Sequence, residues 1–161
     1  MPLGDTGTID AQQERQPECL DPGLLHELLG HLLRHAFNRG QAVFADVFAD
    51  DDITPLQFMI LELVSHNPGI NHSNICAAMG TSASVVTTTL KPLLAAGTLI
   101  GEPSAADRRV TCYRLSPAGE RWFAGLRPKI AECEDRFAGS LTEKQHKDLI
   151  VSLKKLAGLE I

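Results

Sequence analysis

Two short helical segments that meet at a glycine constrain the fold of this chain most strongly. Asn71 is a favourable N-cap for a helix over 72–79, and Gly80 suits the left-handed residue that closes such a helix. Thr81 and Ser82 then precede a second apolar-periodic segment over 83–96, which they are placed to cap. Two short helices joined in this way form a helix-turn-helix.

A β-hairpin is expected directly after this motif. Gly97 ends the second helix and Leu99-Ile100 begin a strand, while residues 110–115 alternate and contain β-branched side chains, as a second strand should. The stretch between them is polar and contains Gly, Pro, Ser and Asp. The sequence therefore predicts a mainly α fold with a small β-hairpin wing, a winged helix-turn-helix over about 53–115.

Longer helices flank this part. Asp21-Pro22 is expected to start a helix over about 21–49 with a wide, Leu-rich apolar stripe in which Gly40 permits a bend. Thr54 and Gln57 form a capping box for the next helix. After the hairpin, helices over about 117–158 are expected, with a kink or break at Pro128.

The flanking helices carry more apolar surface than one small domain needs, so they are predicted to dimerise. Thr142 and Gln145 form a second capping box before the last helix, whose apolar face is a candidate dimer surface made of Leu149, Ile150, Leu153 and Leu156. Residues 1–20 are rich in Gly, Pro and polar side chains and predict a flexible arm. Residues 21–161 are predicted to form a single domain.

The second helix of the motif is the candidate DNA reader. Val86, Leu90 and Leu93 form its buried stripe, and the opposite face carries small hydroxyl groups and one cation: Ser84, Thr87, Thr88 and Lys91, with Ser82 at the start. Short hydroxyl side chains let a helix approach a groove closely and meet phosphates, base edges and thymine methyl groups. The alternative is a Thr-rich helix in an ordinary helical protein.

The expected hairpin tip carries Asp107, Arg108 and Arg109. An arginine at such a tip can enter the narrow, electronegative minor groove of DNA. Asp107 is placed to brace one of the two guanidinium groups by a charge-assisted bond. The alternative for this tripeptide is a solvated surface loop.

Composition limits the other classes of function. The net charge of −5 argues against a general polyanion binder and requires the positive charge of a DNA-binding surface to be local. No apolar stretch approaches the ~20 residues that span a bilayer, and the N-terminus lacks a secretory h-region, so a cytoplasmic protein is expected. Ser116, Cys133 and the histidines form no nucleophile–base set, so neither an enzyme nor a cofactor is expected.

Four segments in this order and spacing resemble the MarR (multiple antibiotic resistance regulator) family over roughly Leu24 to Leu156. They are TPLQFMILELVSHNPG (54–69), NICAAMGTSASVVTTTLKPLLAAGTL (74–99), DRR (107–109) and LSPAGE (115–120). The resemblance implies a homodimer joined through its first and last helices. It also implies a reading helix in the major groove, Arg109 in the minor groove and a pseudo-palindromic double-stranded operator. Family members commonly repress a gene and release DNA on binding a small, often phenolic ligand or on oxidation.

Two departures from the family pattern limit what the resemblance transfers. Ala83 and Thr88 stand where many members carry basic residues, so the base preference is not carried over. Pro92 matches a proline of the organic-hydroperoxide-sensing branch of the family. That branch has a reactive cysteine in its first helix, however, and this chain has no cysteine between Leu24 and Ala49.

Three switches are compatible with the sequence. The first is a small organic effector in a pocket lined by His35, Phe37, Phe58 and Trp122. The alternative for these four side chains is that they are ordinary core residues. The second is thiol oxidation at Cys19, Cys76 or Cys112, or at Cys133. The third is a metal ion held by His31 and His35 with His26 or Glu27, although no complete ligand set is evident and no metal site is predicted.

The sequence therefore predicts a sequence-specific DNA-binding regulator without catalytic activity, a repressor released by a small effector. The alternatives are a thiol-oxidation sensor of the same fold and a helical protein-interaction module that does not bind DNA.

Overall fold

The structure is a computed structural model, and it describes residues 21–159. The predicted arm over 1–20 lies outside the described residues. Contacts divide the chain between His35 and Ala36. The parts before and after this point are therefore described separately.

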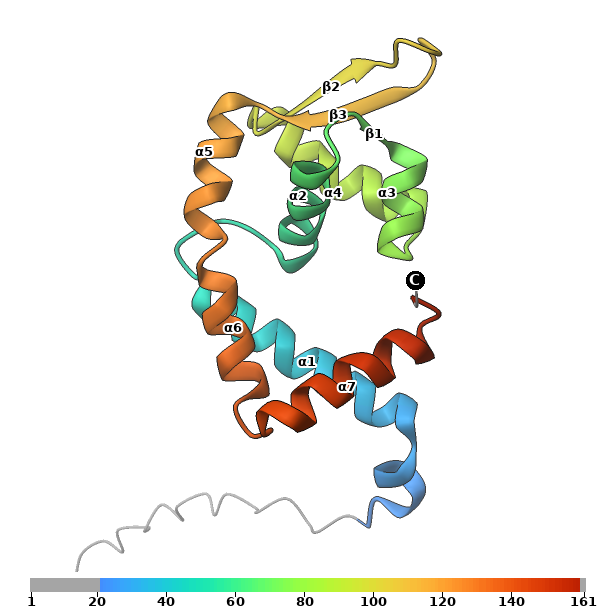
Figure 1. Ribbon diagram of the computed structural model, residues 1–161, viewed down its shortest axis with the longest axis vertical. Helices are drawn as coiled ribbons and strands as arrows, with labels where there is room; N and C mark the ends of the chain where they lie inside the picture. The colour runs from blue at the N-terminus through green and yellow to red at the C-terminus, as the bar shows by residue number, and fades with distance from the viewer. Residues whose placement is uncertain (1–20, 160–161) are drawn as a thin grey trace, which may run out of the picture. The chain divides into compact units, whose positions relative to one another are not determined.

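The described elements confirm a mainly helical fold with a small sheet (Figure 1). In chain order they are the 3₁₀ helix η1 (Gly23–Glu27), α1 (Leu29–Val47), α2 (Pro55–His66), β1 (Ile70–Asn71), α3 (His72–Met79), α4 (Ala83–Ala95), β2 (Leu99–Pro103), β3 (Thr111–Leu115), α5 (Pro117–Leu126), α6 (Lys129–Ala138) and α7 (Glu143–Leu156).

The first helix begins later than the sequence predicts. Asp21 Oδ1 accepts a hydrogen bond from the Gly23 N–H at 2.8 Å, and Gly23 has a φ of +53°. These two features make a turn in place of a first α-helical turn, because the left-handed region favours glycine. Leu28 is extended, so α1 starts only at Leu29. The helix then runs continuously through Gly40, where no break occurs.

The predicted caps are present at most helix ends. Thr54 with Gln57 and Thr142 with Gln145 each form a reciprocal capping box. Asn71 Oδ1 accepts from the Asn74 N–H at 2.9 Å, and Gly80 closes α3 with a φ of 58°. Local side-chain chemistry therefore fixes where these helices begin and end.

Ser82 is an exception among the caps. It occupies the N-cap position of α4 with extended backbone, but its side chain makes no capping hydrogen bond. Its Oγ instead lies 3.0 Å from the Oγ of Ser84. The expectation that the Ser82 side chain caps the helix is therefore wrong. Both hydroxyl groups stay at the exposed N-terminus of α4.

The sheet has three antiparallel strands in the order β1-β3-β2. The hairpin pairs Leu99 with Leu115 at its base and Pro103 with Thr111 near its tip, and β1 adds Ile70 beside Tyr113. Helices α2, α3 and α4 lie together on one side of this sheet, and the β2–β3 hairpin extends away from them (Figure 1). The predicted wing is confirmed.

Four phenylalanines form the centre of the core. Phe44 of α1 and Phe48, which directly follows α1, stack at 4.2 Å between ring centroids, and Phe58 of α2 packs against both of them and against Phe123 of α5. Offset and edge-to-face contacts of this kind add to the free energy gained from burial. They join α1, α2 and α5, which are distant in sequence.

The helix after the wing breaks as predicted at Pro128. The break separates α5 from α6, and side chains beside it pair with residues of α2 and of the turn that precedes α2. Arg127 Nη2 lies 2.7 Å from Glu62 Oε1 of α2, and Lys129 Nζ lies 2.5 Å from Asp51 Oδ2. Arg136 also pairs with Asp46 of α1.

The start of α5 is locked against the base of the wing. The Ser116 hydroxyl donates to the Gly97 carbonyl at 2.7 Å and accepts from the Gly119 N–H at 2.9 Å. A Cβ on Gly119 would stand 2.2 Å from the Thr98 carbonyl oxygen. Only glycine allows so close an approach, so the SPAG segment fixes α5 to the end of α4 and to the first wing strand.

No helix among residues 21–159 is both long and apolar enough to cross a membrane.

We predict that Gly119→Ala lowers the free energy of unfolding by roughly 1–3 kcal/mol, because the new methyl group overlaps backbone that has little freedom to move. Urea unfolding measures this change. Gly125→Ala in the same helix is the matched control, since nothing lies within 4 Å of its Cβ position. It should be neutral or stabilising by up to about 1 kcal/mol. Equal effects of the two variants would contradict the locked junction.

Candidate nucleic-acid interface

Helix α4 buries one stripe and exposes the opposite face, as the sequence predicts. Val86, Leu90 and Leu93 are at most 5% exposed. The predicted contact residues Ser82, Ser84, Thr87, Thr88 and Lys91 are all exposed. A shallow depression of about 240 Å³ on this face is lined by Ser84, Val85, Thr88 and Thr89. Together, these residues present small side chains on an accessible helix surface.

The threonine hydroxyl groups of α4 already have partners for their protons. Thr87, Thr88 and Thr89 each donate to the carbonyl four residues earlier, at 2.8–2.9 Å. Each side chain is therefore left with a methyl group and an oxygen lone pair to offer a partner. Such a surface matches the methyl group of thymine and the exocyclic amino groups of adenine and cytosine.

His72 connects the two helices of the motif, a contact that sequence reasoning missed. Its Nε2 lies 3.0 Å from Thr87 Oγ1, and its Nδ1 lies 3.6 Å from Cys76 Sγ. Because the Thr87 proton is donated to Ala83 O, His72 Nε2 must be the donor to Thr87. His72 thus fixes the orientation of an exposed side chain on α4 from α3.

The wing tip holds one arginine in a defined geometry. Asp107 accepts from Arg109 through Nε at 3.2 Å, through Nη2 at 3.1 Å and through its backbone N–H at 3.0 Å. These bonds hold the pKa of Asp107 below its ordinary value of 3.8 and so favour its ionised carboxylate. The Arg109 side chain is 90% exposed, and Arg108 is also exposed. The guanidinium is braced and fully accessible.

A second ion pair stiffens the wing below its tip. Arg114 Nη2 of β3 donates to Glu102 Oε1 of β2 at 2.8 Å. This bond and the charge of Arg114 lower the pKa of Glu102. The pair links neighbouring strands on an exposed face and so limits bending of the hairpin.

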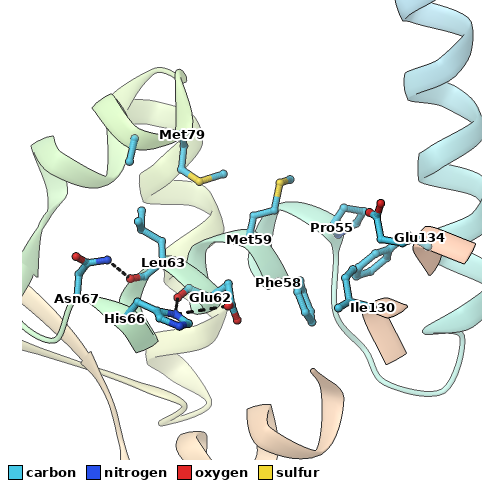
Figure 2. Close-up of a pocket in the computed structure, with 12 residues that line it drawn as sticks. Pro55, Phe58, Met59, Glu62, Leu63, His66, Asn67, Met79, Ile130 and Glu134 are labelled. Carbon is cyan, nitrogen blue, oxygen red and sulfur yellow. Dashed lines mark hydrogen bonds and ion pairs between the residues drawn. The ribbon is translucent and has the colours of Figure 1, made fainter. Parts of the chain in front are cut away.

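An open cavity lies among α1, α2, α3 and α6, apart from the exposed face of α4. It measures about 810 Å³ and is mostly apolar, and Figure 2 shows the side chains around it. Its lining consists of Phe44, Pro55, Phe58, Met59, Glu62, Leu63, His66, Asn67, Ala78, Met79, Ile130 and Glu134. A volume of this size accommodates a small organic molecule.

Of the four predicted pocket residues, only Phe58 lines this cavity. Phe37 of α1 is 62% exposed and Trp122 of α5 is 38% exposed, and neither is part of the lining. His35 belongs to the part of the chain before Ala36 and is exposed there. The sequence prediction followed residue type, whereas the cavity is formed by side chains that come together only through the tertiary packing of α1, α2, α3 and α6.

The candidate redox and metal groups are dispersed. Cys19 lies outside the described residues, Cys76 and Cys112 are half-buried, and Cys133 is buried, which raises the pKa of its thiol. The rings of His31 and His35 contact each other at 4.4 Å between centroids. Over residues 21–159, no group of three or more His, Cys, Asp or Glu side chains could hold a metal ion.

A model of the MarR family matches residues 51–110. The structure of the transcriptional repressor CouR bound to a 23-mer DNA duplex is 30% identical and has a TM-score of 0.80, and the match covers 86% of this chain and 98% of that one. CouR bound to p-coumaroyl-CoA is similar at 28% identity with a TM-score of 0.78, covering 86% of this chain and 97% of that one. The HTH-type transcriptional repressor NicR of Pseudomonas putida is 25% identical over 131 residues, which are 81% of this chain and 82% of NicR.

A capped helix-turn-helix followed by a braced β-hairpin defines a winged helix-turn-helix protein. The chain also matches a model of the MarR family and is 30% identical to CouR over nearly the whole length of CouR. The chain belongs to the MarR family of transcriptional regulators.

We predict that Arg109→Ala weakens DNA binding across all sequences and lowers the salt dependence of binding by about one ion, because one phosphate-neutralising cation is lost. Fluorescence anisotropy over a salt series measures both quantities. Arg121→Ala removes an exposed cation from α5 and is the matched control, with no expected change in slope. A wild-type slope in Arg109→Ala would remove the wing tip from the interface.

We predict that Thr88→Ala lowers discrimination at one base pair of each half-site by about 1–3 kcal/mol, since it removes both the methyl group and the oxygen acceptor. Thr88→Val keeps the methyl group and is the matched variant. It should retain a preference for thymine and lose only the contribution of the oxygen. Competition binding on a panel of single-base operator variants measures this. An unchanged panel for both variants would show that Thr88 points away from the bases.

Proposed function

We propose that this protein is a sequence-specific DNA-binding repressor in which α4 reads the major groove and the wing tip contacts the minor groove. The observation that carries the proposal is the combination of the methyl- and acceptor-bearing face of α4 with the braced, fully exposed Arg109. Ser82, Ser84, Thr87, Thr88, Lys91 and Arg108 complete the proposed contact surface. The DNA-bound structure of CouR, which shares the fold, supports this arrangement.

We propose that the protein acts as a homodimer on a pseudo-palindromic operator. The last helix supports this: Leu149, Ile150, Leu153 and Leu156 on α7 are 36–58% exposed in the single chain. In the part of the chain before Ala36, Leu24, Leu25, Leu28, Leu29 and Leu32 are 45–71% exposed. Large apolar side chains exposed in such numbers favour an interface with a second subunit, and both segments fall within the ranges that the sequence predicts to dimerise.

A small-molecule effector is proposed to release the repressor from DNA. The support is the mostly apolar cavity of about 810 Å³, together with the ligand-bound structure of CouR. The cavity is lined by residues of α2 and α3, and α3 precedes α4 in the helix-turn-helix motif. A molecule that changes the packing of α2 and α3 would therefore alter the position of α4. We propose that the protein carries out no catalysis. We also propose that it acts in the cytoplasm, where it meets its operator.

The experiment that tests the function is selection of bound duplexes from a randomised DNA library, followed by sequencing and by affinity measurements from low to physiological salt. We expect an enriched inverted repeat whose half-sites lie about one helical turn apart, bound with an affinity that falls as the salt concentration rises but is still measurable at physiological salt. Enrichment of no motif, with weak binding that disappears at physiological salt, would overturn the proposal in favour of a protein-interaction module.

A further inference from the structure

His72 stands at a point of the chain that the backbone holds firmly. It is the first residue of α3 and directly follows β1, whose Asn71 is paired with Cys112 of the wing strand β3. The Asn71 side chain also caps α3, because it accepts from the Asn74 N–H at 2.9 Å. Sheet pairing and the cap therefore both fix the position from which the His72 side chain reaches α4.

The His72 ring has a neighbour at each of its nitrogen atoms. Nε2 donates to the Thr87 hydroxyl oxygen at 3.0 Å. A neutral imidazole that donates through Nε2 accepts through Nδ1, and the Cys76 thiol lies 3.6 Å from Nδ1 and is placed to donate to it. His72 and Cys76 are both half-buried. The ring therefore has limited freedom to turn away from α4.

The bond from His72 makes Thr87 different from the next two threonines of α4. The hydroxyl groups of Thr87, Thr88 and Thr89 all donate to the preceding turn. Of these three oxygens, only that of Thr87 also accepts a hydrogen bond from a residue in the range 21–159. Threonine in a helix divides between two side-chain rotamers. The bond from α3 favours one of them, so Thr87 is ordered before DNA binds.

The group that Thr87 can offer to DNA is consequently its methyl group. Its proton is donated to the Ala83 carbonyl, and one of the two acceptor positions of its oxygen is filled by His72. An amino group of adenine or cytosine would compete with His72 for this oxygen. The C5 methyl group of thymine needs no hydrogen bond and makes a favourable apolar contact with a threonine methyl group.

We propose that His72 is a specificity-determining positioning residue, which orders Thr87 so that its methyl group selects a thymine in each half-site of the operator. This inference rests on the proposed function, because it specifies one base of the sequence that α4 reads. His72 acts through Thr87 and makes no base contact of its own. Its loss should change base preference at one position and leave the salt dependence of binding unchanged.

The test replaces each thymine of the selected operator in turn by uracil, which lacks only the C5 methyl group. Anisotropy of the full chain on each duplex gives a uracil penalty, defined as the loss of affinity relative to the unmodified operator. Thr87→Ser keeps the hydroxyl group and removes the methyl group, so the thymine that faces Thr87 is the one whose penalty disappears. With both half-sites substituted, we expect this penalty to be roughly tenfold in the wild-type protein.

Two variants of His72 connect this penalty to the bond between α3 and α4. His72→Phe keeps a ring and removes the donor, so the penalty at the identified thymine should fall at least about twofold, because Thr87 then divides between two rotamers. His72→Gln retains an N–H donor and should restore most of the penalty. Ser73→Ala, at an exposed position in the same turn of α3, is the matched control and should keep the wild-type penalty.

A measurement without DNA tests the ordering of Thr87 directly. Three-bond NMR couplings to its methyl carbon report which side-chain rotamers are populated. We expect one dominant rotamer in the wild-type protein and in His72→Gln, and an average over two rotamers in His72→Phe. His72→Leu removes the donor in the same way and replaces His72→Phe if that variant does not fold.

The outcomes separate this inference from the proposed function. An equal uracil penalty in the wild-type protein and in the variant without the donor, or a single Thr87 rotamer in that variant, would overturn the inference while DNA binding is intact. The same holds if no thymine loses its penalty in Thr87→Ser, or if Ser73→Ala lowers the penalty as much as His72→Phe. Enrichment of no DNA motif at all would instead overturn the repressor function, and this inference with it.

Discussion

The close approach of Gly119 to the Thr98 carbonyl is the constraint on which the arrangement of this molecule depends. At this point the turn after α4, the start of the wing and the start of α5 meet. The Ser116 hydroxyl bonds to Gly97 in that turn and to Gly119 in α5, and the Ser116 backbone N–H donates to the Thr98 carbonyl just before the first wing strand. The wing is therefore held in a fixed position relative to α4. Helix α5 continues from the same junction to Phe123, which packs on Phe58 beside the cavity. One junction thus fixes the relative positions of the two surfaces proposed to contact DNA, and through α5 it connects them to the proposed effector cavity.

Features encoded by neighbouring residues could be predicted from the sequence. The two capping boxes, the left-handed Gly80, the break at Pro128 and the buried stripe of α4 all depend on contacts within a few residues. The hairpin could be predicted because the side chains of its second strand alternate in polarity. The late start of α1 could not be read in the same way, since Asp21 and Pro22 also fit a helix start and the turn at Gly23 competes with it. The caps therefore define most element boundaries, and the exception is a site where two local structures use the same residues.

The candidate site shows the same difference between features set by neighbouring residues and features set by tertiary packing. The exposure of the α4 and wing residues could be predicted from the sequence, because helical periodicity and hairpin position determine it directly. The cavity could not be predicted from the sequence. Its lining residues, such as Met59, Glu62 and Met79, come together only when α2, α3 and α6 pack, and no one of these residues indicates a cavity by itself. The bond from His72 to Thr87 connects residues 15 apart and is equally invisible to local patterns. The inward bonds of the α4 threonines could have been expected, because threonine within a helix commonly donates to the preceding turn.

The sparse positive charge of the proposed DNA-contacting surface has a consequence for how the proposed repressor searches for its operator. Lys91, Arg108 and Arg109 are the exposed cations of α4 and the wing tip, Asp107 balances one of them, and the whole chain carries a net charge of −5. Sequence-independent affinity for DNA arises almost entirely from such cations, whereas methyl and acceptor contacts of the α4 threonines respond little to ions. Most chromosomal sites would therefore compete weakly for this protein. A small number of copies per cell would suffice to keep an operator occupied, and a modest pool of effector would suffice to clear it.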